Sequence, residues 1–369
     1  MRQDYPIRRT LMQHAALSKT PISGILELTP RCNLRCQMCY IRMSPAELAR
    51  HGRERSAAEW LALAEELRAA GSVFLLLTGG EPLLRPDFPD IYRSLSAMGF
   101  SISVNTNGTL LDEKLVALLR ELPPAGINLT LYGAGPEAYA RLCGDGEAWV
   151  RVRRALDLLR EAGTAVTLNT TVTACNQEEL PAVAAIARDR GLHLRVVTYL
   201  FPPLRREGGG MERLSPEEAG RLAALGRKYT DSPETLRARV AAVRARVPEP
   251  CPPEDCLAGS RDGLRCAAGN CQFWVAWSGE MYPCGMMPEP VVFPFRDGFA
   301  PAWQALTASC RALPAALQCD SCQLKPYCPA CAAMAKAETG RTDGLPSYAC
   351  RLTAAYCRSL AEMGPSELP

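Results

Sequence analysis

The chain has 369 residues, of which 47% are apolar, and a formal net charge of +3 at pH 7. At roughly 150 residues per domain, this length predicts one large domain or two to three smaller ones. So balanced a charge gives no reason to expect nucleic acid or a membrane surface as a partner, and no apolar run is long enough to cross a bilayer. Met1–Lys19 is basic but contains no apolar core before a cleavage site, so we expect a cytoplasmic protein.

Cysteine is unusually frequent and unevenly distributed. Five of the 17 cysteines precede residue 250, and the other twelve lie between Cys251 and Cys357. Cytosolic thiols are kept reduced and rarely form disulfides. Such a large number of cysteines therefore predicts metal binding. The uneven distribution indicates a boundary between an ordinary α/β domain and a cysteine-rich one. We expect four segments: an N-terminal extension (1–24), a barrel (25–232), a bridging helix and linker (233–257) and a cysteine-rich domain with a C-terminal helix (258–369).

From Ile25 to about Tyr229, short β-branched or leucine-rich runs alternate with amphipathic stretches, which is the pattern of repeated βα units. The expected strands are Ile25–Thr29, Val73–Thr78, Ser101–Asn105, Ile127–Leu131, Ala165–Val172 and His193–Thr198. The expected helices are Ala57–Ala70, Pro86–Met98, Asp112–Arg120, Ala148–Ala162, Glu178–Arg190 and Pro216–Lys228. Six such units predict an α/β fold, a partial (β/α)6 barrel, with its active site at the C-terminal ends of the strands.

Two segments follow the sixth strand. Phe201–Gly210 is rich in proline and glycine, so we expect an irregular loop that shapes the substrate entrance. Thr235–Val247 predicts a helix with a basic face, which Pro248–Pro253 ends. A solvated surface explains its arginines better than binding of an acidic peptide does.

Three cysteines, Cys32, Cys36 and Cys39, follow the first strand with C-x3-C-x2-C spacing. A four-iron cluster is normally held by four thiolates, so three would leave one iron open to another ligand. The alternative is a zinc knuckle, which needs four protein ligands. No further Cys or His lies close by, since His51 is 12 residues past Cys39. We therefore favour the cluster.

Gly79-Gly80-Glu81 comes one βα unit later, directly after the second expected strand. The glycines would let backbone groups approach a ligand without a Cβ in the way. Together with the three cysteines, this motif resembles the radical S-adenosylmethionine (radical SAM) superfamily. The resemblance implies that SAM chelates the open iron and that its reductive cleavage gives a 5′-deoxyadenosyl radical. It also implies that the glycines receive the SAM amino group, that Glu81 fixes the loop, and that Tyr40 lies beside SAM.

Further SAM contacts follow from the same resemblance. Asn105 and Asn107, in Asn-Thr-Asn-Gly, match a segment that relatives place beside SAM. Thr130 takes the place of a serine that contacts the ribose, while Tyr132 replaces the aspartate that relatives carry two residues later. An expected arginine falls on Cys143, with Arg141 two residues before it. Asn169, on the fifth strand, points to the same face, but an asparagine that caps its own barrel layer is an equally good account.

The C-terminal cysteines resemble the SPASM extension of radical SAM enzymes that modify peptides and proteins, which carries two auxiliary [4Fe–4S] clusters. The resemblance assigns Cys266, Cys271, Cys284 and Cys331 to auxiliary cluster I, and Cys319, Cys322, Cys328 and Cys350 to auxiliary cluster II. One spacing departs from the family: two residues separate Cys328 from Cys331, where relatives have three. Trp274–Tyr282 predicts a β-hairpin that turns at Ser278-Gly279. The alternatives are a zinc ribbon, or Cys256 as a ligand in place of Cys271.

The resemblance therefore implies three [4Fe–4S] clusters, SAM, and hydrogen abstraction from an unactivated carbon. The expected substrate is a ribosomally made precursor peptide that acquires a thioether or carbon–carbon crosslink. A small-molecule dehydrogenase or epimerase acting on a sugar or amine stays open. Sulfatase maturation is disfavoured, because Gly285 stands where that branch has an aspartate. An electron-transfer protein would have no need of Gly79-Gly80-Glu81. Only about 24 residues precede the first strand, so we expect a separate leader-binding protein or docking on the barrel, and a flavodoxin or ferredoxin as electron donor.

Overall fold

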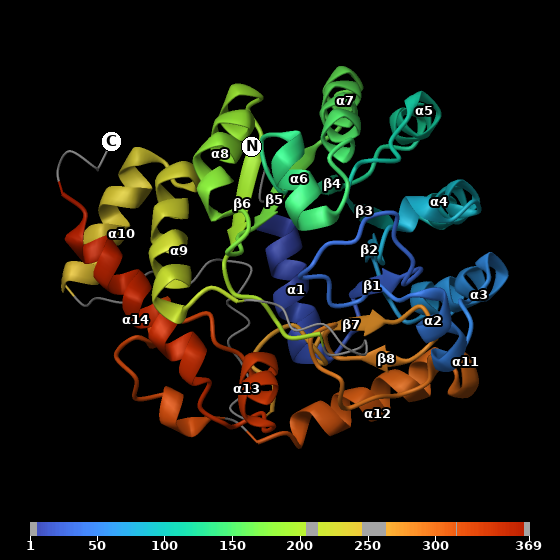
Figure 1. Cartoon of the computed structure of the whole chain (residues 1–369). Helices are drawn as coiled ribbons and strands as arrows, with labels where there is room; N and C mark the ends of the chain where they lie inside the picture. Colours follow the sequence, from blue (N-terminus) through green and yellow to red (C-terminus); the bar gives the residue numbers. More distant parts are fainter. Residues whose placement is uncertain (1–5, 204–212, 246–262, 315, 365–369) are drawn as a thin grey trace.

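The computed structural model describes residues 6–203, 213–245, 263–314 and 316–364. These residues contain one eight-stranded sheet with the strand order β6-β5-β4-β3-β2-β1-β7-β8 (Figure 1). The strands are β1 (Ser23–Glu27), β2 (Phe74–Thr78), β3 (Ser101–Thr106), β4 (Gly126–Thr130), β5 (Val166–Thr171), β6 (His193–Val197), β7 (Gln272–Val275) and β8 (Met281–Tyr282). All neighbouring strands pair in parallel except β7 and β8, which pair antiparallel.

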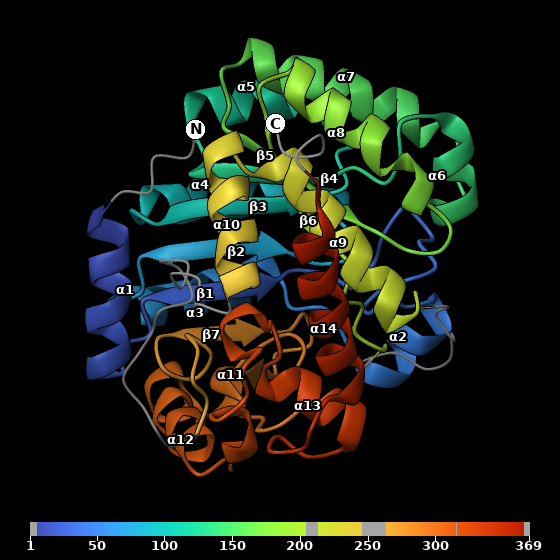
Figure 2. The same cartoon turned by 90° about the vertical axis from the view of Figure 1, so that its left-hand side faces the viewer.

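Helices surround the sheet on its outer face and at one end. They are α1 (Pro6–Ser18), α2 (Pro45–His51), α3 (Ala57–Ala69), α4 (Phe88–Ala97), α5 (Glu113–Glu121), α6 (Pro136–Cys143), α7 (Ala148–Glu161), α8 (Leu180–Asp189), α9 (Pro216–Thr230), α10 (Pro233–Ala245), α11 (Pro294–Asp297), α12 (Phe299–Arg311), α13 (Ala332–Thr339) and α14 (Ser347–Glu362). Helix α14 lies along α9, and α1 lies beside the sheet near β1 (Figure 2). No helix in the described ranges is long and apolar enough to span a membrane.

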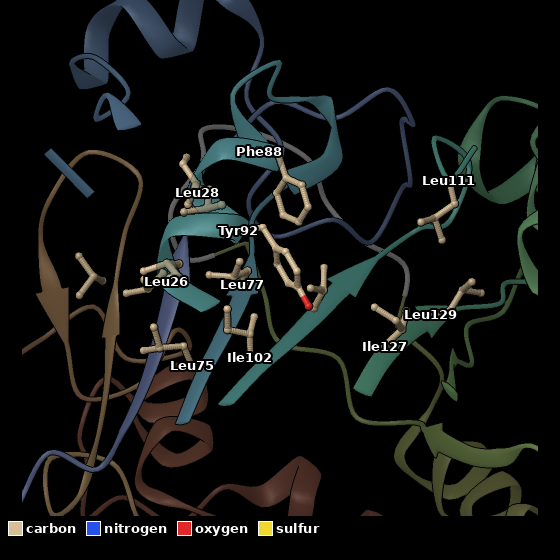
Figure 3. Close-up of a cluster of buried hydrophobic side chains, with 14 of the residues drawn as sticks. Leu26, Leu28, Leu75, Leu77, Phe88, Tyr92, Ile102, Leu111, Ile127 and Leu129 are labelled. Atoms are coloured by element: carbon tan, nitrogen blue, oxygen red, sulfur yellow. The ribbon is translucent and has the colours of Figure 1, made fainter. Parts of the chain in front are cut away.

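The hydrophobic core lies between the sheet and its outer helices. In β3, Ile102 and Val104 are buried on that side, while Ser103 between them is only half-buried. Phe88 and Tyr92 of α4 pack over Leu75, Leu77 and Ile102 (Figure 3). Because side chains alternate across a strand, this packing turns the polar positions of the same strands to the inner face of the sheet.

The six strands expected of the barrel are all present, each within two residues of its predicted bounds. The predicted helices α3, α4, α5, α7, α8 and α9 are likewise confirmed, as is the bridging helix α10. A capping box begins α3: the Ser56 hydroxyl accepts a hydrogen bond from the Glu59 amide, and the Glu59 carboxylate accepts one from the Ser56 amide. Residues 204–210 of the predicted entrance loop and 246–257 of the predicted linker lie outside the described residues.

The predicted hairpin is also confirmed, but its place in the molecule was not foreseen. Strand β7 pairs in parallel with β1, with Gly24 opposite Phe273, so the hairpin extends the barrel sheet instead of standing apart from it. Helices α1, α2 and α6 were not predicted either. The division of the chain into four segments stays a prediction.

The junction of β1 and β7 leaves no space for a side chain at Gly24. A Cβ there would lie 2.6 Å from the ring of Phe273, which is fully buried. We therefore expect Gly24→Ala to lower the free energy of unfolding by about 1–3 kcal/mol through overpacking. Urea unfolding of the apo-protein measures it. An unchanged midpoint would show that the hairpin does not pack on β1 as described.

Candidate active site

A cavity of about 320 Å³ lies at the C-terminal ends of the barrel strands. Its walls come from the cysteine loop after β1, the Gly79-Gly80 loop after β2, and the ends of β3 to β6. The predicted site residues that line it are Cys32, Cys36, Cys39, Tyr40, Gly79, Gly80, Asn105, Asn107, Thr130 and Asn169. These residues thus meet at the end of the barrel strands where the sequence predicted the site, although Glu81 and Arg141 do not line this cavity.

Hydrogen-bond donors surround the sulfurs of the cysteine loop. The Leu34 amide donates to Cys32 Sγ at 3.4 Å, and the Arg42 amide donates to Cys39 Sγ at 3.2 Å. Asn107 Nδ2 adds a contact of 3.6 Å to Cys32 Sγ. Donors to a thiolate favour its charged form. The loop is thus arranged to hold thiolates, the form of cysteine that binds metal.

The other side of the cysteine loop is attached to the C-terminal end of α6. The amides of Arg35 and Gln37 donate to the carbonyls of Cys143 and Leu142 at 2.9 and 3.0 Å. The Gln37 side chain donates to the carbonyl of Arg141 at 2.9 Å. The last carbonyls of a helix have no partner within the helix, so the loop satisfies α6 while α6 fixes the loop.

Arg141 therefore contributes its backbone here and not its side chain. Its half-exposed guanidinium lies 3.7 Å from Glu179. Glu179 also accepts a hydrogen bond from the Ala134 amide at 2.9 Å. The structure does not bring the Arg141 side chain to the cavity, because α6 directs it toward α8.

Glu81 is fully buried behind the cavity wall. Its carboxylate accepts hydrogen bonds from the Asn107 amide at 2.7 Å, the Thr106 hydroxyl at 2.9 Å and the Leu83 amide at 3.0 Å. Burial raises the pKa of Glu81 to about 7, while these donors act in the opposite direction. Glu81 thus ties the loop after β2 to the end of β3, in keeping with the loop-fixing role that the resemblance implied.

The two glycines before Glu81 face the backbone of the cysteine loop. A Cβ at Gly80 would lie 2.3 Å from the Arg31 carbonyl oxygen, and one at Gly79 would lie 2.5 Å from that of Thr29. The Gly80 amide donates to Thr29 O at 2.7 Å. The approach of a ligand is therefore not the only reason for glycine at these positions, because two loops of the protein itself also meet there.

The asparagines of the inner face form a short polar row. Asn128 Nδ2 donates to Asn105 Oδ1 at 2.8 Å, and Asn105 Nδ2 lies 3.4 Å from the Thr78 hydroxyl. Asn169 Oδ1 is buried and has no hydrogen-bond partner among the described atoms. An unpaired buried oxygen is costly. Since Asn169 lines the cavity, a ligand with a donor group fits there.

The cavity thus offers three thiols at one end and an unsatisfied amide oxygen on its wall. Each cysteine is free of disulfide bonds. This donor set fits a thiolate-bound iron–sulfur cluster together with a ligand that carries amino and hydroxyl groups, as SAM does.

The C-terminal cysteines form two groups. Burial raises the pKa of Cys350, and the nearby thiols of Cys328, Cys319 and Cys322 act in the same direction. Cys328 Sγ also lies 3.3 Å from the Thr353 hydroxyl. The four thiols predicted for auxiliary cluster II therefore lie near one another. No three Cys, His, Asp or Glu side chains in the described segments are placed to bind a single metal ion.

The second group lies where the N-terminal helix meets the loop before β7. Burial raises the pKa of Cys271 to about 11, and Cys266 adds to the effect. Cys310, which the sequence left unassigned, is buried and also faces Cys266. The other two predicted ligands of auxiliary cluster I lie elsewhere along the chain: Cys284 follows β8, and Cys331 begins α13 next to Cys328.

The side chain of Asn270 organises this second group. Its Nδ2 donates to the carbonyls of Leu264 and Cys266, both at 2.7 Å. Its Oδ1 accepts from the ammonium of Lys19, at the end of α1. The N-terminal extension thus packs against the cysteine-rich region. Cys256, the alternative ligand, lies outside the described residues.

Comparison with known proteins identifies the barrel. Residues 26–187 match the model of the radical SAM superfamily. The chain therefore carries a radical SAM domain. Such domains bind a [4Fe–4S] cluster and SAM.

Three relatives extend the comparison. The chain is 27% identical to an AdoMet-dependent heme synthase from Methanosarcina barkeri over 338 residues, which are 88% of this chain and 95% of the relative. It is 32% identical to a PqqA peptide cyclase from Granulibacter bethesdensis over 171 residues, 46% of this chain and 45% of that relative, so it matches about half of the cyclase. Streptococcus suis SuiB bound to its precursor peptide SuiA shares the fold, with a TM-score of 0.68 at 16% identity over 93% of this chain and 80% of SuiB. The shared fold thus includes the cysteine-rich region.

A single methyl group at Gly80 tests the contact between the two loops. Gly80→Ala should weaken SAM binding by about tenfold or more, because relief of the clash moves the loop at a cost of about 1–3 kcal/mol. SAM affinity, measured by equilibrium binding to the anaerobically reconstituted protein, checks this. Gly135→Ala is the control, since a Cβ there approaches only the flexible end of Glu137, at 3.1 Å. Unchanged affinity in Gly80→Ala would place SAM elsewhere.

Proposed function

We propose that this protein is a radical SAM peptide maturase, which abstracts hydrogen from a ribosomally made precursor peptide and forms a thioether or carbon–carbon crosslink. When bound, the cluster and SAM would supply the reactivity, since one electron from the cluster would split SAM to methionine and a 5′-deoxyadenosyl radical. Cys32, Cys36 and Cys39 hold the cluster in this proposal. The Gly79-Gly80 loop receives the SAM amino group. Asn169, with its unpaired oxygen, orients SAM on the cavity wall.

The composition of the cavity wall is the observation that carries the proposal. Part of it is lined by Val197, Tyr199, Leu200, Phe201 and Met286, and in this proposal that part receives the substrate. No Lys, Arg, His, Asp or Glu lines it among the described residues. An apolar wall excludes water from a reactive radical and fits an uncharged side chain presented on a peptide. The fold shared with SuiB, which was solved with its precursor peptide, supports the same conclusion.

The cysteine-rich region completes the proposal as a SPASM domain with two auxiliary [4Fe–4S] clusters. After one hydrogen atom has been abstracted from the C–H bond, formation of the new bond to X leaves one electron and the proton of X–H to be removed. An auxiliary cluster would accept the electron, and a base would accept the proton. The grouping of Cys319, Cys322, Cys328 and Cys350 supports this for auxiliary cluster II. A flavodoxin or ferredoxin would supply the first electron, and either a separate leader-binding protein or the barrel itself would bind the leader of the peptide.

A second candidate is a step of heme synthesis, which differs from the sugar or amine substrate that the sequence analysis left open. It is favoured by the match to the heme synthase, which runs along 88% of this chain. The uncharged cavity wall counts against a porphyrin that carries several carboxylates, because buried charges need partners.

The substrate experiment separates the two candidates. The reduced protein is incubated with SAM and either a peptide encoded beside its gene or an iron porphyrin bearing propionate groups. We expect 5′-deoxyadenosine to rise above the substrate-free background only with the peptide. The peptide should lose the mass of about two hydrogens per new bond, as when one C–H and one X–H are replaced. Turnover of the porphyrin with no change in the peptide would replace the proposal by the second candidate.

Loss of auxiliary cluster II should separate radical formation from product formation. The wild-type protein should hold about twelve irons in three four-iron clusters. The Cys319→Ala/Cys322→Ala variant should lose about four irons, still form 5′-deoxyadenosine and make no crosslinked product. Iron analysis and mass spectrometry measure this. Cys32→Ala/Cys36→Ala/Cys39→Ala is the matched control, with the same iron loss but no SAM cleavage. A normal product yield in the first variant would exclude a role for this cluster.

A further inference from the structure

Two side chains from outside the cysteine loop converge on one of its cysteines. Tyr132 and Cys143 both make hydrogen-bonding contacts with Cys36, the middle cysteine of the loop. Backbone amides donate to Cys32 and Cys39, and the Asn107 amide contacts Cys32. Cys36 thus has contacts from a thiol and from a hydroxyl.

The backbone fixes Cys143 beside Cys36. The residues on both sides of Cys36 donate to the end of α6, Arg35 to the Cys143 carbonyl and Gln37 to the Leu142 carbonyl. Cys143 is fully buried, so its thiol has no access to water. Tyr132 follows β4, and its ring packs edge-on against Tyr139 of α6 at 5.9 Å between centroids. Neither side chain can turn away without breaking this packing.

The proton positions follow from the chemistry of the three groups. A cysteine that binds iron does so as a thiolate, which has no proton to donate. The thiol of Cys143 and the hydroxyl of Tyr132 each carry one proton and make hydrogen bonds with Cys36. Cys36 is therefore the acceptor, and the other two are the donors.

We propose that the thiol of Cys143 and the hydroxyl of Tyr132 donate hydrogen bonds to the Cys36 thiolate and thereby raise the reduction potential of the SAM-binding cluster. Hydrogen bonds to cluster sulfurs stabilise the reduced state, which carries more negative charge. Ligand-orienting groups of this kind tune metal sites without binding the metal. The two residues are positioning residues in this proposal. It rests on the radical SAM domain alone and not on the identity of the substrate.

The test is a redox titration of the anaerobically reconstituted full-length protein without substrate, followed by electron paramagnetic resonance. The signal of the SAM-binding cluster is the one that the Cys32→Ala/Cys36→Ala/Cys39→Ala variant lacks. Tyr132→Phe removes only the hydroxyl, and Cys143→Ala removes only the thiol. For each, we expect the ratio of reduced to oxidised cluster at a fixed applied potential to fall about tenfold, which is a shift of about 59 mV for one electron.

Two further variants distinguish hydrogen bonding from packing. Cys143→Ser keeps a donor and should stay close to the wild-type potential. Cys175→Ala removes a neighbouring thiol that contacts Gln37 and not a cluster cysteine, so it should leave the potential unchanged. An unchanged potential in both Tyr132→Phe and Cys143→Ala would overturn the proposal. Loss of about four irons in Cys143→Ala would also overturn it, because Cys143 would then be needed to hold the cluster.

Discussion

The cysteine loop is held between two other parts of the barrel by hydrogen bonds from backbone to backbone. On one side, the amides of Gly80 and Glu81 donate to the carbonyls of Thr29 and Arg31 at 2.7 and 2.8 Å. On the other side, the loop donates its own amides to the end of α6. Each such bond adds only about 1 kcal/mol net. Together they fix a segment without regular secondary structure, so that three thiols can face one cavity.

A buried charged network supports the base of the same loop. Glu54 accepts from the Thr29 hydroxyl at 2.6 Å and pairs with Arg31 at 2.7 Å. Arg85, almost fully buried, donates to the carbonyls of Leu28 and Arg55 at 2.9 and 3.0 Å. An exposed ion pair stabilises little, but the buried guanidinium of Arg85 satisfies two backbone carbonyls, one of which, that of Leu28, lies where β1 passes into the loop. The loop is thus fixed at its base as well as along its sides.

Local patterns in the sequence predicted the features that depend on residues close to one another in the chain. The alternation in each strand, each helix cap and the motifs at Cys32 and Gly79 span only a few residues, so the barrel and the position of the site could be predicted. The rest depends on contacts between distant residues. The pairing of Gly24 with Phe273 leaves no trace in either strand. The contact between Cys36 and Cys143 depends on α6, an eight-residue helix without a side-chain cap, which the sequence did not reveal. The unpaired oxygen of Asn169 likewise became visible only once its neighbours were placed.

The sheet that joins the barrel to the hairpin also explains how the cysteine-rich region reaches the cavity. Because β7 continues the sheet from β1, the chain leaving β8 arrives at the cavity, and Met286, two residues after Cys284, forms part of its wall. At the other end of this region, α14 carries Cys350 and packs closely on α9, where a Cβ at Gly220 would lie 2.3 Å from the Leu352 carbonyl oxygen. So close a contact leaves α14 little freedom to slide. Cys284 and Cys350 are therefore held at fixed positions relative to the barrel, as the electron-accepting role proposed for the auxiliary clusters requires.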